Sequence, residues 1–331
     1  MMQFSIHNLK TSNASILRRA ERSGMTLVEL MISLVILMII LGAVYSILNL
    51  QQTKSIQVTR TTVLQTDAQV AFTLVKWDLL LAGLGYPYEE QDALQLANIG
   101  SDLTLKGVGL GFEMSRTQWS YLLDNVDGST LPVRRWEDTL ANFRVGDTII
   151  VINEVREALY QNLIITGIDT FTYYDPIWSN PTRGLRLNIG PSITARAGLM
   201  VFRRNSDTYY NGLTYTLAGD TLMRGNEALL TNVEAIQFRY GIDTDNDGIV
   251  ESWGANNNPP FNNNYSDKWA VRFTMVVSSD LISGYTSPDD SITIEDDPPY
   301  TYTLDLYQKR RKRAILSSVV FPQNLQPPEG L

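Results

Sequence analysis

The chain has 331 residues, of which 44% are hydrophobic, so it can bury a core in one large or two modest domains. Its net charge of −8 argues against broad nucleic-acid binding, because proteins hold polyanions mainly by neutralising phosphates. It has no cysteine, and its one histidine is His7 near the N-terminus. Disulfides, Ser-His-Asp catalysis and the usual zinc sites are therefore excluded beyond that residue, and an enzyme would have to use carboxylates or a Ser-Lys pair.

An uncharged apolar segment begins at Leu30 and ends at Leu48. It is about long enough to cross a bilayer, which takes roughly 20 apolar residues. The basic stretch Arg18–Gly24 before it favours a cytoplasmic N-terminus. A secretory signal has its small-residue cleavage site after the apolar run, whereas Gly24 precedes this one, so we expect processing on the cytoplasmic side.

Glu29 lies at the edge of this apolar segment. A carboxylate there is costly, so the residue is expected to be functional. The alternative is an ordinary signal anchor with Glu29 near the lipid headgroups.

The residues from Ser23 to Leu30, SGMTLVEL, resemble the prepilin cleavage motif, in which a peptidase cuts after a glycine. The resemblance implies cleavage between Gly24 and Met25, N-methylation of Met25, and an assembly role for Glu29 at the fifth mature position. Met25 stands where phenylalanine is commonest in the family, at a position that tolerates substitution.

The helical pattern continues beyond the membrane segment. Neither proline nor glycine interrupts it between Ala43 and Ala82, and the breakers Gly83 and Pro87 follow. The sequence predicts one helix of residues 25–81, apolar in its first half and amphipathic in its second. The apolar positions that recur every seven residues in its second half are Ile56, Val63, Val70 and Trp77.

After Pro87 the pattern changes to short β-rich runs separated by Gly, Asn, Asp and Pro. Residues 88–145 carry few strand signals and are expected to be loops with minor elements. Asn256–Asn264 (NNNPPFNNN) is expected to be a surface loop. The clearest predicted strands are Thr148–Asn153, Asn162–Ile168, Gly198–Arg203, Leu213–Leu217, Ala235–Tyr240, Val271–Val277 and Ile315–Phe321.

Three segments resemble minor pilins of the PilW type. Phe72–Gly83 is similar to the end of that family's helix, where an acidic residue, here Asp78, precedes an Ala-Gly turn. Val233–Gly248 (VEAIQFRYGIDTDNDG) is the closest match, and Lys309–Phe321 resembles the final strand. The J-type minor pseudopilins of type II secretion share this architecture and remain the alternative.

The resemblance implies an α+β, pilin-like fold: a leader of residues 1–24, a stalk helix of residues 25–81 and a β-rich head of residues 82–331. The stalk's first half would join a filament core and its second half would carry the head. Expected partners are other minor and major pilins, the prepilin peptidase and the inner-membrane assembly platform. The chain would cross the inner membrane once with its head in the periplasm, and would then join a pilus at the cell surface.

An Asp-rich turn follows the strand around Tyr240, and its alternating acids suit calcium, as in the first half of an EF-hand loop. The twelfth position is Gly254, where an EF-hand needs glutamate, so another residue such as Asp267 would have to complete the site. The alternative is a solvated hairpin turn without metal. The residues expected to supply ligands are Asp243, Asp245, Asp247, Ile249 and Glu251.

Two charged runs are further candidate sites. Lys309–Arg313 (KRRKR) could bind DNA or an anionic polymer, but a solvated edge strand is the favoured interpretation. Asp289–Asp297 (DDSITIEDD) is expected to be a solvated loop. The six tryptophans and sixteen tyrosines are assigned to the core and surface of the head, the alternative being an adhesive role for some.

Overall fold

A computed structural model describes residues 26–87, 92–110, 119–174, 181–204, 211–245, 247–254, 268–282, 284–296 and 299–326. The chain divides into two units, Met1–Thr59 and Arg60–Leu331. Gly24, Met25, Asp267 and the loop Asn256–Asn264 lie outside the described residues.

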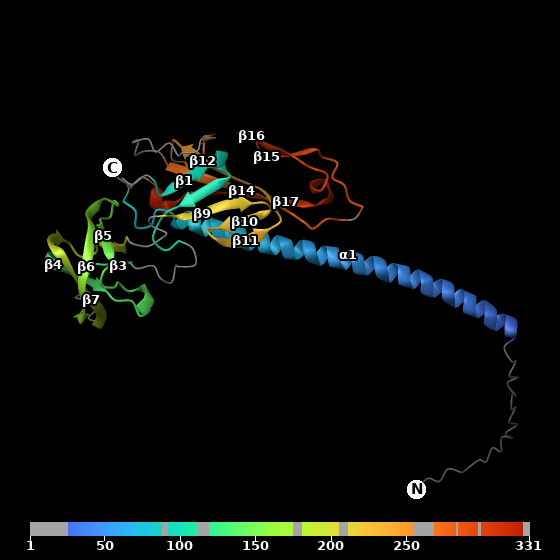
Figure 1. Ribbon diagram of the computed structural model, residues 1–331, viewed down its shortest axis with the longest axis horizontal. Coiled ribbons are helices and arrows are strands. Elements are labelled where there is room, and N and C mark those ends of the chain that lie inside the picture. The colour runs from blue at the N-terminus through green and yellow to red at the C-terminus, as the bar shows by residue number, and fades with distance from the viewer. Residues whose placement is uncertain are drawn as a thin grey trace, which may run out of the picture. The chain divides into compact units, whose positions relative to one another are not determined.

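Helix α1, Leu27–Leu81, is one uninterrupted helix of 55 residues (Figure 1). Its end at Leu81 is the residue at which the sequence predicts a stop. Gly83 follows with a φ of +78°, and a Cβ added there would lie 2.2 Å from a methyl carbon of Leu325. Glycine is needed because an L side chain would meet both the left-handed backbone conformation and that contact.

The first unit contains the apolar part of α1. Leu27–Ile56 is a candidate membrane span of 30 residues with a mean hydropathy of 2.8. None of its side chains is buried within the protein, which is the arrangement expected of a helix whose apolar surface is covered by lipid or by other subunits.

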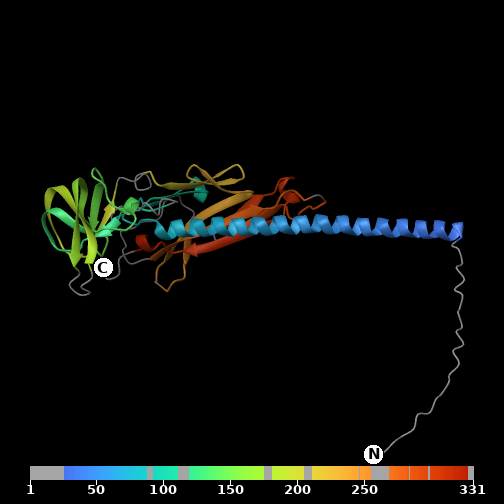
Figure 2. The ribbon, with the colours of Figure 1, turned by 90° about the horizontal axis from the view of Figure 1, so that it is seen from below.

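In the second unit, α1 packs on β-sheets through small and aliphatic side chains. Phe72 stacks on Phe273 of the neighbouring sheet, with ring centroids 4.8 Å apart. The C-terminal part of α1 runs beside β14 and β17 in both views (Figures 1 and 2). The buried helical residues are Ala68, Ala71, Val75, Asp78 and Leu79.

The apolar positions that recur every seven residues do not form the face of α1 that packs on the head. Val70 and Trp77 are 57% and 56% exposed, and Ile56 in the first unit is 54% exposed. The buried face instead follows a spacing of three and four residues and begins with two alanines. Close packing of the helix on a sheet favours such small side chains, so hydrophobicity alone does not predict the buried face.

Two antiparallel sheets form the first core together with α1. One has the order β1-β2-β9-β10-β11, and the other has the order β13-β12-β14-β17. The strands of the first are β1 Leu94–Ala97, β2 Asp102–Leu105, β9 Leu213–Ala218, β10 Thr221–Arg224 and β11 Glu227–Thr231. Those of the second are β12 Val233–Asp243, β13 Ser252–Gly254, β14 Lys268–Ser278 and β17 Arg313–Val320.

A third sheet has the order β3-β8-β5-β6-β7-β4 and surrounds a second core, which includes Leu131, Ile165 and Val201. A bridge between Leu122 and Val133 joins its two outer strands, so the sheet closes into a barrel (Figure 2). Its strands are β3 Trp119–Tyr121, β4 Val126–Arg134, β5 Thr148–Ile152, β6 Ala158–Tyr174, β7 Pro181–Ala195 and β8 Met200–Arg203. Closure removes the exposed strand edges of an open sheet.

The remaining regular elements are short. A two-stranded hairpin joins β15 Ser291–Asp296 to β16 Pro299–Thr303. The 3₁₀ turns are η1 Asn98–Gly100, η3 Thr139–Ala141, η4 Gln308–Arg310 and η5 Gln323–Leu325.

The long apolar helix and β-rich head confirm the α+β, pilin-like prediction, and each of the seven predicted strands corresponds to an observed one. Residues 88–145 hold short elements between loops, as predicted, except for the nine-residue strand β4. Two local predictions are wrong. Ser291–Asp296 of the acidic run is a strand. Lys309 and Arg310 lie in a 3₁₀ turn before the edge strand β17, which begins only at Arg313.

Candidate functional site

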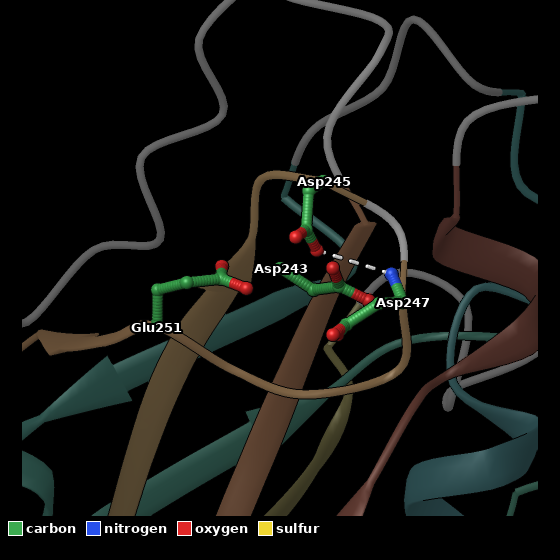
Figure 3. A group of neighbouring side chains, drawn as sticks. All are labelled: Asp243, Asp245, Asp247 and Glu251. Carbon is green, nitrogen blue, oxygen red and sulfur yellow. Dashed lines mark hydrogen bonds between the residues drawn. The ribbon is translucent and has the colours of Figure 1, made fainter.

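The Asp-rich loop connects β12 to β13 and gathers four carboxylates around one point (Figure 3). Each contributes one oxygen, and these four oxygens all lie within 4.8 Å of one another. Asp243 ends the long central strand β12 and is buried, whereas the other three side chains are exposed. The carboxylates belong to Asp243, Asp245, Asp247 and Glu251.

Side-chain to backbone hydrogen bonds hold this loop in a tight turn. The amide of Gly248 donates to Oδ2 of Asp243 at 2.9 Å, and the amide of Asp247 donates to Oδ1 of Asp245 at 3.2 Å. Oε2 of Glu251 accepts from the amide and hydroxyl of Thr244 at 2.8 and 3.1 Å. Gly248 has a φ of +89°, which lets the chain turn back toward β13.

The other oxygen of Asp243 is buried and has no hydrogen-bond partner among the described residues. Leaving such an acceptor unsatisfied costs roughly 1–3 kcal/mol, and more when it is charged. A cation bound by this oxygen would remove the penalty. The turn alone does not account for this oxygen, since the hydrogen bonds of the loop use the opposite one.

The carboxylates of this cluster act on the pKa of Asp245. The amide of Asp247 acts to lower the pKa of Asp245, but desolvation and the charges of Asp247, Glu251 and Asp243 outweigh it. The net pKa of Asp245 is therefore raised above its ordinary value of 3.8. Glu251 behaves oppositely: the hydrogen bond from the amide of Thr244 is the largest cause of its lowered pKa.

Oxygen donors in this number fit calcium, which takes six to eight oxygen ligands. The side chain of Ile249 is 67% exposed, and its amide donates to Asp247 at 2.7 Å, so its carbonyl is the group that would serve as a ligand. The structure thus brings together the four acidic residues predicted from spacing. It does not test the proposed ligand Asp267, and Gly254 ends β13 without a donor side chain.

Glu29, the predicted assembly residue, forms a capping box at the start of α1. Its Oε2 accepts from the amide and hydroxyl of Thr26 at 2.9 and 3.1 Å, and the Thr26 hydroxyl accepts from the Glu29 amide at 3.3 Å. The Thr-x-x-Glu spacing was a signal for this box in the sequence. Glu29 therefore has a local structural role in the first turn, to which any assembly role would be added.

The structure also pairs buried charges that sequence reasoning missed. Oδ2 of Asp78 accepts from Nε and Nη2 of Arg224 at 2.9 and 2.7 Å and from the hydroxyl of Tyr215. All three residues are buried, and burial is the main cause of the raised pKa of Tyr215. The acidic residue before the Ala-Gly turn thus fixes α1 to the five-stranded sheet.

Several residues of the basic run Lys309–Arg313 form ion pairs or hydrogen bonds with other residues of the head. Arg313 is paired with Glu234 on β12, and both side chains are at most 7% exposed. Lys309 forms an ion pair with Asp290, and Arg311 donates to Asn232 at 3.2 Å. The solvated-strand interpretation is therefore wrong for Arg313, and these contacts disfavour a polyanion site.

Two family models match the chain. The model for the prokaryotic N-terminal methylation motif matches residues 19–45, and the model for type IV pilus-assembly protein W matches residues 203–324. The second match contains the acidic loop, β12, β14 and β17, while the first contains Glu29 and the start of α1. Searches of curated proteins and of solved structures found no match.

Proposed function

We propose that this chain, a type IV pilin-like minor pilin, is built into a type IV pilus, where it primes assembly or occupies the tip. The observation that carries the proposal is the order of its parts. A methylation motif at residues 19–45 opens a membrane-length helix, and the same helix continues into a head that matches pilus-assembly protein W. The head of residues 82–331 is too large and irregular for a closely repeated major subunit.

Before assembly, the chain would be held in the inner membrane by the apolar part of α1, with its head in the periplasm. Its partners would be other minor and major pilins, the prepilin peptidase and the inner-membrane assembly platform. The matched families are pilus components, which favours a structural role over a membrane-anchored enzyme. The match to a pilus-assembly protein also favours a pilus over a type II secretion pseudopilin.

The head would also bind one calcium ion through Asp243, Asp245, Asp247 and Glu251, with the carbonyl of Ile249 as a further ligand. The buried oxygen of Asp243 that has no partner in the part of the chain that the structure describes favours this over a metal-free turn, because a hairpin turn gives no reason to bury it. Calcium would be structural, since it would join the end of β12 to the start of β13.

Processing can be tested by replacing Gly24 with leucine. Prepilin cleavage after Gly24 requires a small residue at that position, so the variant should accumulate as a full-length precursor in the membrane fraction. An immunoblot that resolves the loss of 24 residues would separate precursor from mature chain. A Ser23→Leu variant, which changes the neighbouring position, is the control and should still mature. Normal maturation of Gly24→Leu would exclude Gly24 as the cleavage position.

A further inference from the structure

The barrel formed by β3 to β8 lies outside both family matches, apart from its last residue, Arg203. It has its own buried core, in which Leu131, Leu187 and Val201 are fully enclosed. The family match therefore does not describe what this part of the head does. A closed barrel with a filled interior can still carry a ligand at its mouth.

One mouth of the barrel holds an open cleft of about 700 Å³, within the range typical of small-ligand sites. The cleft is formed where β4 and β6 begin and β7 ends, together with the loop after β5 and the residue before β8. Its floor consists of Val126, Ala195 and Leu199, which belong to the barrel core. Leu159, 43% exposed, extends this apolar surface to the edge of the cleft.

The cleft's polar side chains accept hydrogen bonds from backbone amides and from one hydroxyl of the barrel. Oδ1 of Asn125 accepts from the amide of Ala197 at 2.9 Å, and Oδ1 of Asn153 accepts from the amide of Glu157 at 2.8 Å. Oδ1 of Asp127 accepts from the hydroxyl of Thr194 at 3.3 Å. Among the described contacts, the Nδ2 of Asn125 and the second oxygen of Asp127 remain available to a ligand.

The chemistry of the cleft selects a class of ligand. An anion is disfavoured, because the cationic Arg196 is already paired with Glu154 at 2.8 Å and Asp127 is negative. An aliphatic ligand would cover the apolar floor but would make no hydrogen bond to the amide and carboxylate groups of the rim. A sugar ring has one C–H face that packs on leucine, and hydroxyls that both donate to Asp127 and accept from Asn125.

We propose that this cleft binds a neutral saccharide unit, as one residue of a glycan outside the cell. The binding itself follows from the barrel and goes beyond the role in the pilus. Only the extracellular setting rests on the proposed function, so a chain that fails to enter pili would still bind the sugar.

The test is saturation-transfer difference NMR on the full-length chain in lauryldimethylamine oxide micelles, since detergents with sugar headgroups would compete. The probes are the methyl glycosides of glucose, galactose, mannose and N-acetylglucosamine, each at millimolar concentration. We expect transfer to at least one probe and a loss of about tenfold or more in affinity for Asp127→Ala, which removes a charged hydrogen-bond acceptor. Glu137→Gln, an exposed acid of the same barrel outside the cleft, should bind as the unaltered chain does.

A second variant guards against misfolding of the barrel. Leu159→Glu changes an exposed side chain and places a charge in the cleft, so it should abolish transfer without altering the melting temperature. Saturation transfer to none of the four methyl glycosides would overturn the proposal, whether or not a tripeptide added as a control receives transfer. So would transfer to the glycosides that both variants leave unchanged.

Discussion

At the scale of single residues, Asp243 has the most unfavourable surroundings in the acidic loop. Its carboxylate is buried at the end of β12, one of its oxygens has no partner among the described residues, and the four acids of the cluster each have an oxygen within 4.8 Å of the others. Without a cation this arrangement destabilises the head by desolvation and by repulsion between like charges. In the proposed calcium site the same groups would be ligands, so metal should stabilise the folded state.

We predict that calcium raises the melting temperature of the detergent-solubilised chain. A ligand that binds only the folded state at a hundredfold excess over its Kd stabilises it by roughly 2.7 kcal/mol. For a head of this size that is a shift of about 5 °C. Tryptophan fluorescence should show this shift between calcium and chelator, and Asp245→Ala should remove it, whereas Asp289→Ala should not. Equal melting temperatures in calcium and chelator would leave only the hairpin turn.

The same site should lose calcium on acidification, because a ligand carboxylate must give up its proton. The pKa of Asp245 is raised, so its proton returns at a higher pH than in the unfolded chain. In chelator the sign is reversed: ionised Asp245 destabilises the folded state above its raised pKa, and acidification relieves that cost. The calcium-dependent shift should therefore shrink as the pH falls toward that pKa.

Glu29 combines a helix cap with a charge, and two substitutions separate these contributions. We predict that Glu29→Ala and Glu29→Gln are both inserted and cleaved, yet both fail to enter pili, because pairing with the terminal amine of a neighbouring subunit needs the charge. Glutamine keeps the capping box. The measurement is recovery of each variant in sheared filaments; normal recovery of Glu29→Gln would show that only the cap matters.

At the scale of elements, α1 is fixed to the head by both packing and charge. Ala68, Ala71 and Val75 bring the helix close to the sheets, and Asp78 pairs with Arg224 of β10 in a site where both side chains are at most 4% exposed. The exposed Val70 and Trp77 lie on a different face of the helix. Their exposure leaves an apolar surface on the second half of α1.

We predict that Asp78→Asn destabilises the head by about 3 kcal/mol or more, because it leaves the buried guanidinium of Arg224 without its counter-charge. Asp67→Asn, an exposed position on the same helix, should change stability by less than about 0.5 kcal/mol. Urea unfolding followed by circular dichroism would measure both. Similar midpoints for the two variants would mean that the buried pair contributes little.

At the scale of the whole molecule, periodicity and composition predicted the helix, its end, the seven clearest strands and the acidic cluster. These patterns did not predict features that depend on tertiary packing. Strand β4 contains Gly128 and Pro132, which weaken its β signal, and it is stabilised by pairing with β7. The buried face of α1 begins with Ala68 and Ala71, which a search for large apolar side chains overlooks.

The partners of the buried charges could not be predicted from the sequence either. Asp78 and Arg224 lie 146 positions apart, and Glu234 and Arg313 lie 79 apart. Spacing along the chain carries no information about such pairs, whereas the carboxylates at Asp243, Asp245 and Asp247 converge through local turn geometry. Sites made by one loop are therefore predictable, and sites assembled by the fold are not.

We infer that the chain is processed and becomes a pilus subunit. Mass spectrometry of sheared, purified filaments from cells that produce the chain tests both steps at once. We expect an N-terminal peptide that begins with N-methylated Met25, followed by Thr-Leu-Val-Glu. A chain that is absent from the filaments, or present there with residues 1–24 still attached, would contradict it.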